Sequence, residues 1–356
     1  MTSLALRRIF SPHSSEQQRL VDCRGSGGGA PAGVHGGRAP CVDSLALMGS
    51  VTPSTRTGVR VRVPAKINLA LKVGAPRRDG YHPLATVYHA VSLYDEVEAT
   101  WANPDEFTVK VDGEGADQVP LDSTNLAVRA AKLLAHHYAP RDSLGASLSI
   151  KKSIPVAGGL AGGSANGAAA LLACAVLWDL DITPERLRML AGEIGSDVPF
   201  ALLGGTAVGS GRGEEVAPAL ARGMYHWVLA FGYHGLSTAA VYRHFDELTP
   251  GAPPPKVPAD LMNALRRGDP RLLGAALNND LQPAALELQP QLRTVLQTGL
   301  EYGALGAVVS GSGPTCAFLA DGESAAVELS VSLSGEGLCR AVRRATGPVP
   351  GARLID

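Results

Sequence analysis

Residues 154–180 read IPVAGGLAGGSANGAAALLACAVLWDL, a glycine-rich stretch that passes directly into an alanine-rich apolar segment. Glycine lacks a Cβ atom, so its N–H group can approach a bulky ligand and its backbone can adopt positive φ without strain. We expect a helix to begin at Ser164. The first turn of a helix has unpaired N–H donors and a partial positive charge, which together bind anionic oxygen. The stretch therefore predicts a binding site for a phosphate chain.

Two common phosphate-binding motifs come close to this spacing but do not match it. From Gly158 to Gly163 the pattern is G-x-x-x-x-G, yet Ser164 and Ala165 stand where a P-loop requires Lys and Ser or Thr. A dinucleotide-binding fold needs G-x-G-x-x-G in its first strand–helix unit, whereas several predicted strands precede these glycines. On composition alone the stretch would be a mobile loop. The order of Pro155, paired glycines, serine and an immediate helix favours a phosphate loop of another kind.

The composition excludes several classes of partner. The 356 residues carry a net charge of −1 and are 45% hydrophobic, so no basic excess attracts nucleic acid or an anionic membrane. The longest apolar run, which ends at Trp178, is shorter than the ~18–20 residues that span a bilayer and predicts a buried helix. The cysteines form no CxxC pair, which argues against a zinc site or a disulfide framework and fits a reducing cytoplasm. We expect a small-molecule substrate and a monomer or weak homodimer.

The chain divides into a tail and two lobes. Residues 25–37, GSGGGAPAGVHGG, are more than half glycine, so we interpret residues 1–57 as a disordered tail. An organellar targeting segment, or a start assigned upstream of a true start such as Met48, is an alternative explanation of this stretch. The remaining length exceeds one usual core and predicts an N-terminal lobe over 58–220 and a C-terminal lobe over 221–356.

Hydrophobic periodicity predicts an α+β fold with largely antiparallel strands. Residues 58–74 predict two short strands broken at Pro64, and Thr124 or Ser123 is expected to cap the first long helix. Residues 250–258 are rich in proline and predict an exposed connection. The other expected strands cover 82–101, 107–113, 144–156, 225–232, 306–310, 315–320 and 338–345, and the expected helices 124–139, 164–180, 183–195, 259–268, 270–278, 287–302 and 322–333.

Three segments, in this order, resemble the GHMP kinases. They are VPAKINLALKVGAPRRDGYHPLATV at 63–87, PVAGGLAGGSAN at 155–166 and GAVVSGSGPTCAFL at 306–319, and the resemblance covers about 59–345. It implies a two-lobed GHMP kinase fold, with an N-terminal ribosomal-S5-like ATP-binding lobe and a C-terminal α/β sandwich lobe. The P-A-K-x-N and D-G-Y-H elements resemble the members that phosphorylate a cytidyl sugar alcohol in the non-mevalonate isoprenoid pathway. Such a kinase uses ATP and Mg²⁺.

The resemblance also implies roles for matching residues. Lys66 and Asp197 match the catalytic pair, and Asn68 matches a residue near the sugar alcohol. Tyr81 and His82 match the pair that holds the cytosine ring by stacking and by edge hydrogen bonds. The implied second stacking ring is Tyr242; the implied support of the loop is Gly311 and Gly313; the implied ATP-phosphate loop is Pro155, Val156, Ala157, Gly158, Gly159, Leu160, Ala161, Gly162, Gly163, Ser164 and Ala165. Relatives carry a further glycine at Ala157 and usually alanine at Gly167, which points to altered loop rigidity.

Each residue taken alone has a structural explanation. Lys66 would be a solvated lysine, and Asp197 would cap a helix that has Pro199 in its first turn. Tyr81 and His82 would form a turn after Asp79-Gly80, Asn68 would end a strand, and the third segment would be a hairpin turn. Their joint occurrence in family order favours the kinase. The alternatives are another GHMP kinase, acting on homoserine or a mevalonate-type alcohol, and a catalytically silent nucleotide-binding regulator; a NAD-linked oxidoreductase lacks its fingerprint.

Overall fold

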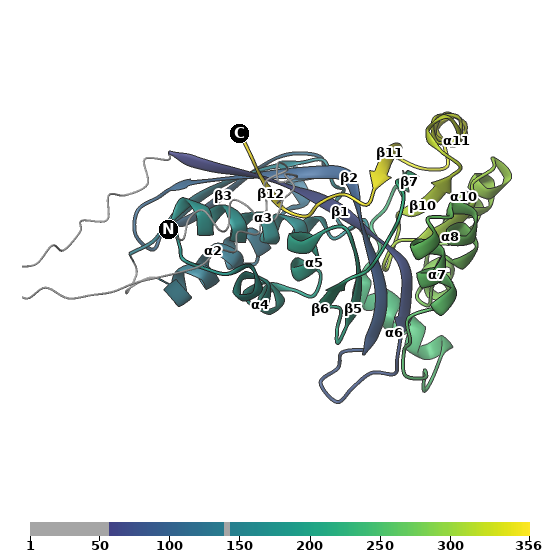
Figure 1. Ribbon diagram of the computed structural model, residues 1–356, viewed down its shortest axis with the longest axis horizontal. Coiled ribbons are helices and arrows are strands. Elements are labelled where there is room, and N and C mark those ends of the chain that lie inside the picture. The colour runs from purple at the N-terminus through teal and green to yellow at the C-terminus, as the bar shows by residue number, and fades with distance from the viewer. Residues whose placement is uncertain (1–56, 139–142) are drawn as a thin grey trace, which may run out of the picture.

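The computed structural model describes residues 57–138 and 143–356 of the chain (Figure 1). The tail expected over 1–57 lies outside the described residues except for Thr57, and Cys23 and Cys41 lie outside them too. Within the described ranges, no helix has both the length and the apolar character that crossing a bilayer requires.

An eight-stranded, mainly antiparallel sheet forms the body of the N-terminal half. Its main path runs β12 (Arg353–Ile355), β1 (Gly58–Val73), β2 (Leu84–Trp101), β4 (Ala146–Lys152) and β3 (Phe107–Gly113), while β5 (Thr206–Ser210) pairs with β2, β6 (Glu215–Pro218) with β5 and β8 (Asn278–Asn279) with β1. Only the β1–β8 and β3–β4 pairs among these strands are parallel. The sequence pattern predicted β1, β2, β3 and β4, but not the shorter β5, β6, β8 and β12, and the pairing confirms the largely antiparallel character.

The first strand corrects the prediction of two strands broken at Pro64. β1 pairs with β2 along its whole length, and the register shifts where Pro64 faces Tyr94 but Ala65 faces Val91. Proline has no N–H to give to a ladder, so a sheet accepts it at an edge or a bulge. The bulge in the pairing accommodates Pro64, and the strand continues.

Four helices cover one face of this sheet, as Figure 1 shows. They are α2 (Leu126–Tyr138), α3 (Gly162–Leu177), α4 (Pro184–Ile194) and α5 (Val198–Leu203), and a short 3-10 helix, η1 (Ala116–Gln118), lies before α2. α3 is almost entirely buried, as its apolar sequence predicted, but it begins two residues before Ser164. The expected cap of α2 is wrong, because Asn125 Oδ1 accepts the Ala127 N–H at 2.9 Å, while Thr124 donates to Asp122.

A second, antiparallel sheet of four strands forms the C-terminal half. Its order is β11 (Ala341–Gly347), β7 (Tyr225–Phe231), β10 (Cys316–Ala320) and β9 (Gly306–Val309). The helices of this half are α6 (Thr238–Leu248), α7 (Ala259–Arg267), α8 (Pro270–Ala276), α9 (Gln282–Leu288), α10 (Gln291–Glu301) and α11 (Glu323–Gly335). Residues 250–258 form the predicted connection between α6 and α7.

Two predictions for the C-terminal half are wrong. The single helix expected over 287–302 is α10 alone, preceded by a separate α9, since Pro290 cannot continue the hydrogen-bond ladder of the earlier helix. The strand expected over 338–345 is not the last element. After β11 the chain returns to the first sheet, where β12 pairs with Arg60–Arg62 of β1.

Candidate active site

Lys66 and Asp197 lie close together although they come from distant parts of the chain. Lys66 Nζ is 3.7 Å from Asp197 Oδ2 and donates a hydrogen bond to Asn68 Oδ1 at 2.7 Å. Lys66 is only 7% exposed, whereas the Asp197 side chain is 28% exposed. A solvated lysine is thereby excluded. The pair presents a held ammonium group and a carboxylate that solvent or a substrate can reach.

The backbone before α5 directs the Asp197 carboxylate toward Lys66. Asp197 occupies the N-cap position of α5, but its side chain makes no capping hydrogen bond. Pro199 in the first turn of α5 has no N–H to be capped. Asp197 is therefore placed as a helix cap would be, while its carboxylate remains free for the neighbouring ammonium group.

The bulge at Pro64 and a second register shift between Asn68 and Ala70 bracket Lys66 and Asn68 on β1. Asn68 Nδ2 donates to Thr86 Oγ1 at 2.8 Å, and Thr86 in turn donates to the Ala70 carbonyl at 2.8 Å. The side chains of Lys66, Asn68 and Thr86 are almost fully buried. This chain of hydrogen bonds fixes the direction of the Lys66 ammonium group, since each donor is satisfied by the next acceptor.

The glycine loop is held against the third segment of the sequence. Gly159 has φ +76°, and a Cβ atom there would lie 2.1 Å from the Ser310 carbonyl oxygen, so only glycine fits. Ser310 Oγ donates to the Gly159 carbonyl at 3.0 Å, and the Thr315 N–H donates to the Gly158 carbonyl at 3.3 Å. The structure thus brings together the two glycine-rich segments that the sequence singled out.

The same loop also contacts the strand that carries Lys66. The Lys66 N–H donates to the Leu160 carbonyl at 3.2 Å, and Lys66 Nζ lies 3.4 Å from the position that a Cβ of Gly311 would occupy. The first hydrogen bond into α3 is from Ala165 N–H to the Ala161 carbonyl, so the preceding N–H groups of the helix have no partner within its ladder. The loop that offers main-chain donors therefore lies directly beside the Lys66–Asp197 pair.

His82 and Tyr242 form one side of the predicted substrate end. Their ring centroids are 4.9 Å apart at a tilted angle. His82 Nδ1 lies 2.9 Å from the Gly74 carbonyl, and its Nε2 lies 3.5 Å from Asp246 Oδ2. Burial, and then the nearby Asp197 carboxylate, raise the pKa of Tyr242 above its ordinary value. Tyr242 therefore lies near both His82 and Asp197.

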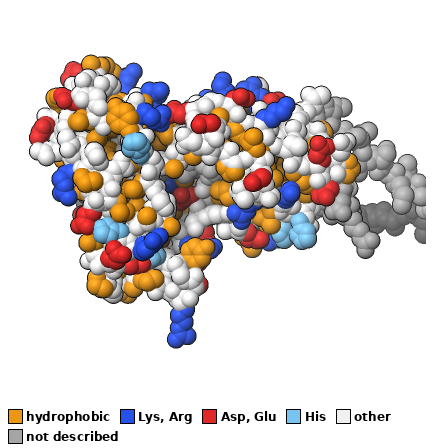
Figure 2. All heavy atoms as spheres, turned by 180° about the vertical axis from the view of Figure 1, so that it is seen from behind, with side chains coloured by type: hydrophobic (Ala, Val, Ile, Leu, Met, Phe, Trp, Pro, Cys, Tyr) orange, Lys and Arg blue, Asp and Glu red, His pale blue; other side chains and the backbone are white. Residues whose placement is uncertain are grey.

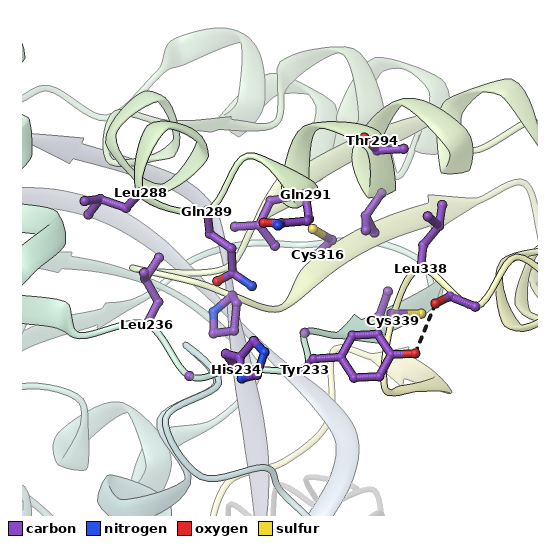
Figure 3. A pocket seen from close by; sticks show the side chains of 17 residues that line it. Tyr233, His234, Leu236, Leu288, Gln289, Gln291, Thr294, Cys316, Leu338 and Cys339 are labelled. Carbon is purple, nitrogen blue, oxygen red and sulfur yellow. Dashed lines mark hydrogen bonds between the residues drawn. The ribbon is translucent and has the colours of Figure 1, made fainter.

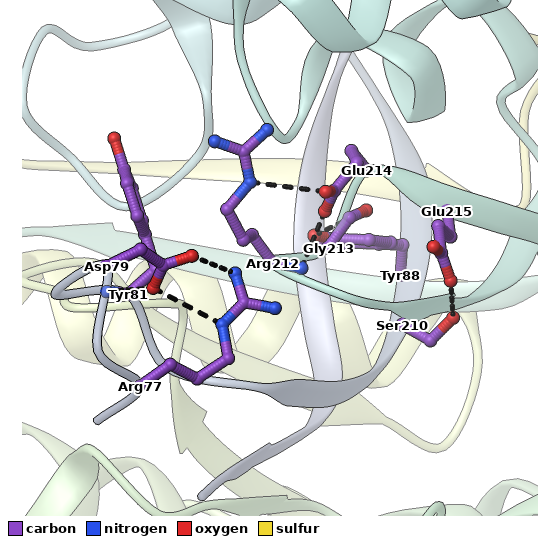
Figure 4. A network of polar contacts seen from close by, with 9 residues as sticks. All are labelled: Arg77, Asp79, Tyr81, Tyr88, Ser210, Arg212, Gly213, Glu214 and Glu215. Atoms are coloured by element: carbon purple, nitrogen blue, oxygen red, sulfur yellow. Dashed lines mark hydrogen bonds and ion pairs between the residues drawn. The ribbon is translucent and has the colours of Figure 1, made fainter. Parts of the chain in front are cut away.

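Tyr81 lies at the rim of the site, with 53% of the residue exposed. Its N–H donates to Asp79 Oδ1 at 3.0 Å, and Arg77 pairs with the same carboxylate, which holds the turn in shape. The guanidinium group of Arg212 lies 5.0 Å from the centre of the Tyr81 ring, a cation–π distance. Figure 4 shows Arg77, Asp79 and Tyr81 in one turn, with Arg212 approaching from another part of the chain.

Arg212 belongs to the turn between β5 and β6. Its Nε donates to Glu214 Oε1 at 3.1 Å and its N–H donates to Glu214 Oε2 at 2.6 Å (Figure 4). The hydrogen bond with Glu214 raises the pKa of Arg212. Partial burial opposes the shift at Glu214, but main-chain N–H groups of the turn and the Arg212 guanidinium lower the pKa of the Glu214 carboxyl below its ordinary value. The turn also contacts β2, because the Tyr88 hydroxyl donates to the Gly213 carbonyl at 3.4 Å.

Sequence reasoning missed Tyr88, which lies close to Lys66 and Asp197. Burial, followed by the Asp197 carboxylate, raises the pKa of Tyr88 well above its ordinary value, and Lys66 Nζ lies 5.6 Å from the Tyr88 ring centroid. Tyr88 faces Asn68 across the β1–β2 ladder. The two-residue spacing of Thr86 and Tyr88 on β2 indicates that both side chains lie on the same face of the sheet. This signal identifies neighbours of Asn68 only once the register of β1 and β2 is known.

A cavity lies in the C-terminal half, and neither Lys66 nor Asp197 lines it. It measures about 580 Å³ and is lined by apolar side chains together with Tyr233, His234 and Gln289, as Figure 3 shows. Both Cys316 and Cys339 border it. On the face seen in Figure 2, acidic and basic side chains are interspersed, which is unlike the one-sided basic surface of a nucleic-acid-binding protein.

Comparison with known proteins identifies the family. The profile of the GHMP kinases N terminal domain matches residues 125–205, and that of the GHMP kinases C terminal matches residues 261–337. The chain is 54% identical over 300 residues to a 4-diphosphocytidyl-2-C-methyl-D-erythritol kinase of Mycobacterium tuberculosis, an alignment that covers 84% of this chain and 93% of the relative. It is 53% identical over 305 residues to that of Thermobifida fusca, covering 84% of this chain and 99% of the relative.

A solved structure agrees with these relatives. The crystal structure of a 4-(cytidine 5'-diphospho)-2C-methyl-D-erythritol kinase has a TM-score of 0.65 and 32% identity to this chain, and it covers 80% of this chain and 98% of its own length. The predicted α+β fold with GHMP kinase N- and C-terminal parts is thereby confirmed. On this combined evidence of sequence and fold, the chain belongs to the GHMP kinase family.

Proposed function

We propose that this chain transfers the γ-phosphoryl group of ATP to the 2-hydroxyl of 4-diphosphocytidyl-2-C-methyl-D-erythritol. This reaction is a step of the non-mevalonate route to isoprenoid precursors. Identity of 54% to enzymes of that name, over 93% of their length, supports the activity. The observation that carries the mechanism is the 3.7 Å separation of Lys66 Nζ and Asp197 Oδ2 beside the glycine loop.

The acceptor hydroxyl is proposed to lie between Asp197 and the donor phosphate. Phosphoryl transfer has a loose transition state, so catalysis consists mainly of alignment and of stabilising charge on the transferring oxygens. The Asp197 carboxylate would orient the hydroxyl and accept its proton as the new P–O bond forms. The Lys66 ammonium group, held by Asn68 at 2.7 Å, would pair with an oxygen of the transferring group.

The donor triphosphate is proposed to bind to the loop over Pro155–Ala165. The unpaired N–H groups at the start of α3 and the partial positive charge of that helix end suit phosphate oxygens. In residues 57–138 and 143–356 no three His, Cys, Asp or Glu side chains gather into a metal site. We propose that Mg²⁺ arrives on the phosphates of ATP, and that the Ser164 hydroxyl in the first turn of α3 is an oxygen ligand that the loop offers. When bound, the ion would neutralise charge on the phosphoryl oxygens.

The cytidyl end of the substrate is proposed to lie among Tyr81, His82 and Tyr242. An exposed tyrosine ring offers a face on which a base can stack. His82 Nε2 and the Asp246 carboxylate, 3.5 Å apart, present polar atoms to the edge of the ring. Asn68, buried beside Lys66, would lie near the sugar alcohol. Neither homoserine nor mevalonate has an aromatic ring to fill this end of the cleft.

A panel of acceptors tests the proposal. ADP release is measured with ATP and, in turn, the diphosphocytidyl substrate, homoserine and mevalonate, and the product is examined for a new phosphate ester. We expect turnover with the diphosphocytidyl substrate alone. Turnover with another alcohol would identify a different GHMP kinase, and no turnover with any of the three, despite ATP binding, would indicate the silent regulator.

A further inference from the structure

A buried polar cluster lies beneath the glycine loop and has no part in the chemistry described so far. It consists of Asp95 on β2, Lys152 at the end of β4 and Asn166 on α3, which are 0%, 4% and 3% exposed. A carboxylate and an ammonium group lose their hydration at such a place, and they are kept only where other groups satisfy them. We name these three residues the Asp95 cluster.

Each oxygen of the Asp95 carboxylate accepts two hydrogen bonds. Oδ1 accepts the main-chain N–H groups of Ser153 at 2.7 Å and Ile154 at 2.8 Å. Oδ2 accepts Lys152 Nζ at 2.6 Å and Asn166 Nδ2 at 2.8 Å. Lys152 Nζ also donates to Asn166 Oδ1 at 3.2 Å. The hydrogen-bonding capacity of the carboxylate is therefore satisfied. Its partners come from the segments that precede and follow the loop.

The Asp95 carboxylate contacts both ends of the phosphate loop. Ser153 and Ile154 lead directly into Pro155, where the loop begins, and Asn166 follows directly after Ala165, where it ends. Lys152 Nζ supports the first turn of α3 as well, since it lies 3.3 Å from the position of a Cβ on Gly162. A single side chain thereby fixes the distance between the strand that enters the loop and the helix that leaves it.

We propose that the Asp95 cluster is a positioning device for the donor phosphates. It sets the spacing at which the N–H groups of the loop and of the first turn of α3 converge on a triphosphate. Small errors in such spacing are costly, because transfer depends on alignment of donor and acceptor. This inference rests on the proposed use of ATP. It assigns to residues outside the substrate cleft a specific effect on nucleotide affinity.

Asn166→Ala is the variant that tests the proposal. It removes the link from Asp95 to α3 but leaves the ion pair with Lys152 and the contacts with Ser153 and Ile154 in place. Loss of hydrogen bonds to a charged group is expected to raise the KM for ATP about tenfold and to leave the KM for the cytidyl substrate within about twofold. Asp95→Asn is less informative, because its amide group would face two donors and the chain could fail to fold.

Direct binding separates positioning from general loss of stability. ATP and AMP are titrated into wild-type protein, into Asn166→Ala and into Leu172→Ala, a control that removes buried apolar atoms from the same helix. We expect the advantage of ATP over AMP to fall about tenfold in Asn166→Ala only. An unchanged advantage, or an equal fall in the control at a matched loss of Tm, would overturn the proposal. Absence of kinase turnover in the wild type would refute the proposed function, while this binding comparison would still decide the role of the cluster.

Discussion

At the scale of single residues, position in the fold decides which polar side chains suit the proposed chemistry. Lys66 is buried and held by Asn68, so its ammonium group has one direction and little competition from water. Asp197 is partly open, which suits a carboxylate that must meet a substrate. Tyr81 is more open still, and Arg212 and Asp79 hold it from two sides. Exposure therefore increases along the path that the proposed function gives, from the reacting atoms to the outer end of the substrate.

Tyr81→Ala tests the substrate end at this scale. The change removes an exposed ring on which a base can stack, and stacking contributes ~1–3 kcal/mol per base. We expect the KM for the cytidyl substrate to rise at least about fivefold while the KM for ATP stays the same. Steady-state kinetics with each substrate varied in turn measures both. Tyr302→Ala, which removes another exposed tyrosine ring at the end of α10, is the matched control and should alter neither constant.

At the scale of elements, backbone conformation shapes the phosphate loop. Ala157 has φ 52° and Ala161 φ 58°, in the left-handed region that favours glycine. At Gly167 the relevant factor is space and not backbone conformation. A Cβ there would lie 3.3 Å from Leu126 Cβ, where α2 approaches α3 closely. The two departures from the family pattern therefore have different effects. The alanine strains the loop, whereas the glycine lets two helices pack.

Ala157→Gly should stabilise the protein. A left-handed alanine costs ~1–2 kcal/mol, and the greater chain entropy of glycine in the unfolded state offsets part of the gain. The expected rise in the free energy of unfolding is about 0.5–1 kcal/mol, measured by urea denaturation. Ala165→Gly, in the first turns of α3, is the control and should lower it by about 1 kcal/mol. Equal losses in both variants would show that Ala157 is not strained.

At the scale of the whole molecule, the two sheets are joined through buried contacts. His89 of β2 lies 5.8 Å, between ring centroids, from Tyr225 and from Trp227 of β7. The Thr346 N–H of β11 donates to Ser92 Oγ of β2 at 2.8 Å. β12 also returns from the second half to the first sheet. The division into lobes at residues 58–220 and 221–356 therefore remains a proposal. The last strand, β12, belongs to the second range by sequence but pairs with the sheet of the first.

Stability should fall in mild acid because of His89. Burial lowers its pKa to about 3, from an ordinary value of 6.5. The unfolded chain then binds a proton that the folded protein does not, so this contribution is lost as the pH falls from about 6.5 toward 3. Between pH 7.0 and 5.5 the expected loss is about 1.3 kcal/mol of unfolding free energy. Urea denaturation at both values, compared with the uncharged variant His89→Gln, isolates the effect; equal slopes for the two proteins would contradict it.

Local signals in the sequence predicted much of this fold, and contacts between distant segments explain the rest. The glycine loop, the buried α3 and most strands follow from periodicity and turn residues near each element. β12 is too short to show a period, and its place depends on β1. The roles of Tyr88 and Asp95 depend on partners more than fifty residues away in the sequence, Asp197 for one and Asn166 for the other. The assignments of Lys66, Asp197 and the ATP loop stay predictions for experiment.

The most direct test of the account is the rate of the chemical step in Asp197→Asn. Rapid-quench measurement with saturating ATP and diphosphocytidyl substrate follows phosphoryl transfer itself, and titration of each substrate checks that binding survives. A positioned general base contributes ~10²–10⁴ in rate, so the variant should bind both substrates and lose a factor in that range. Transfer at nearly the wild-type rate would contradict the claim that Lys66 and Asp197 flank the reacting hydroxyl.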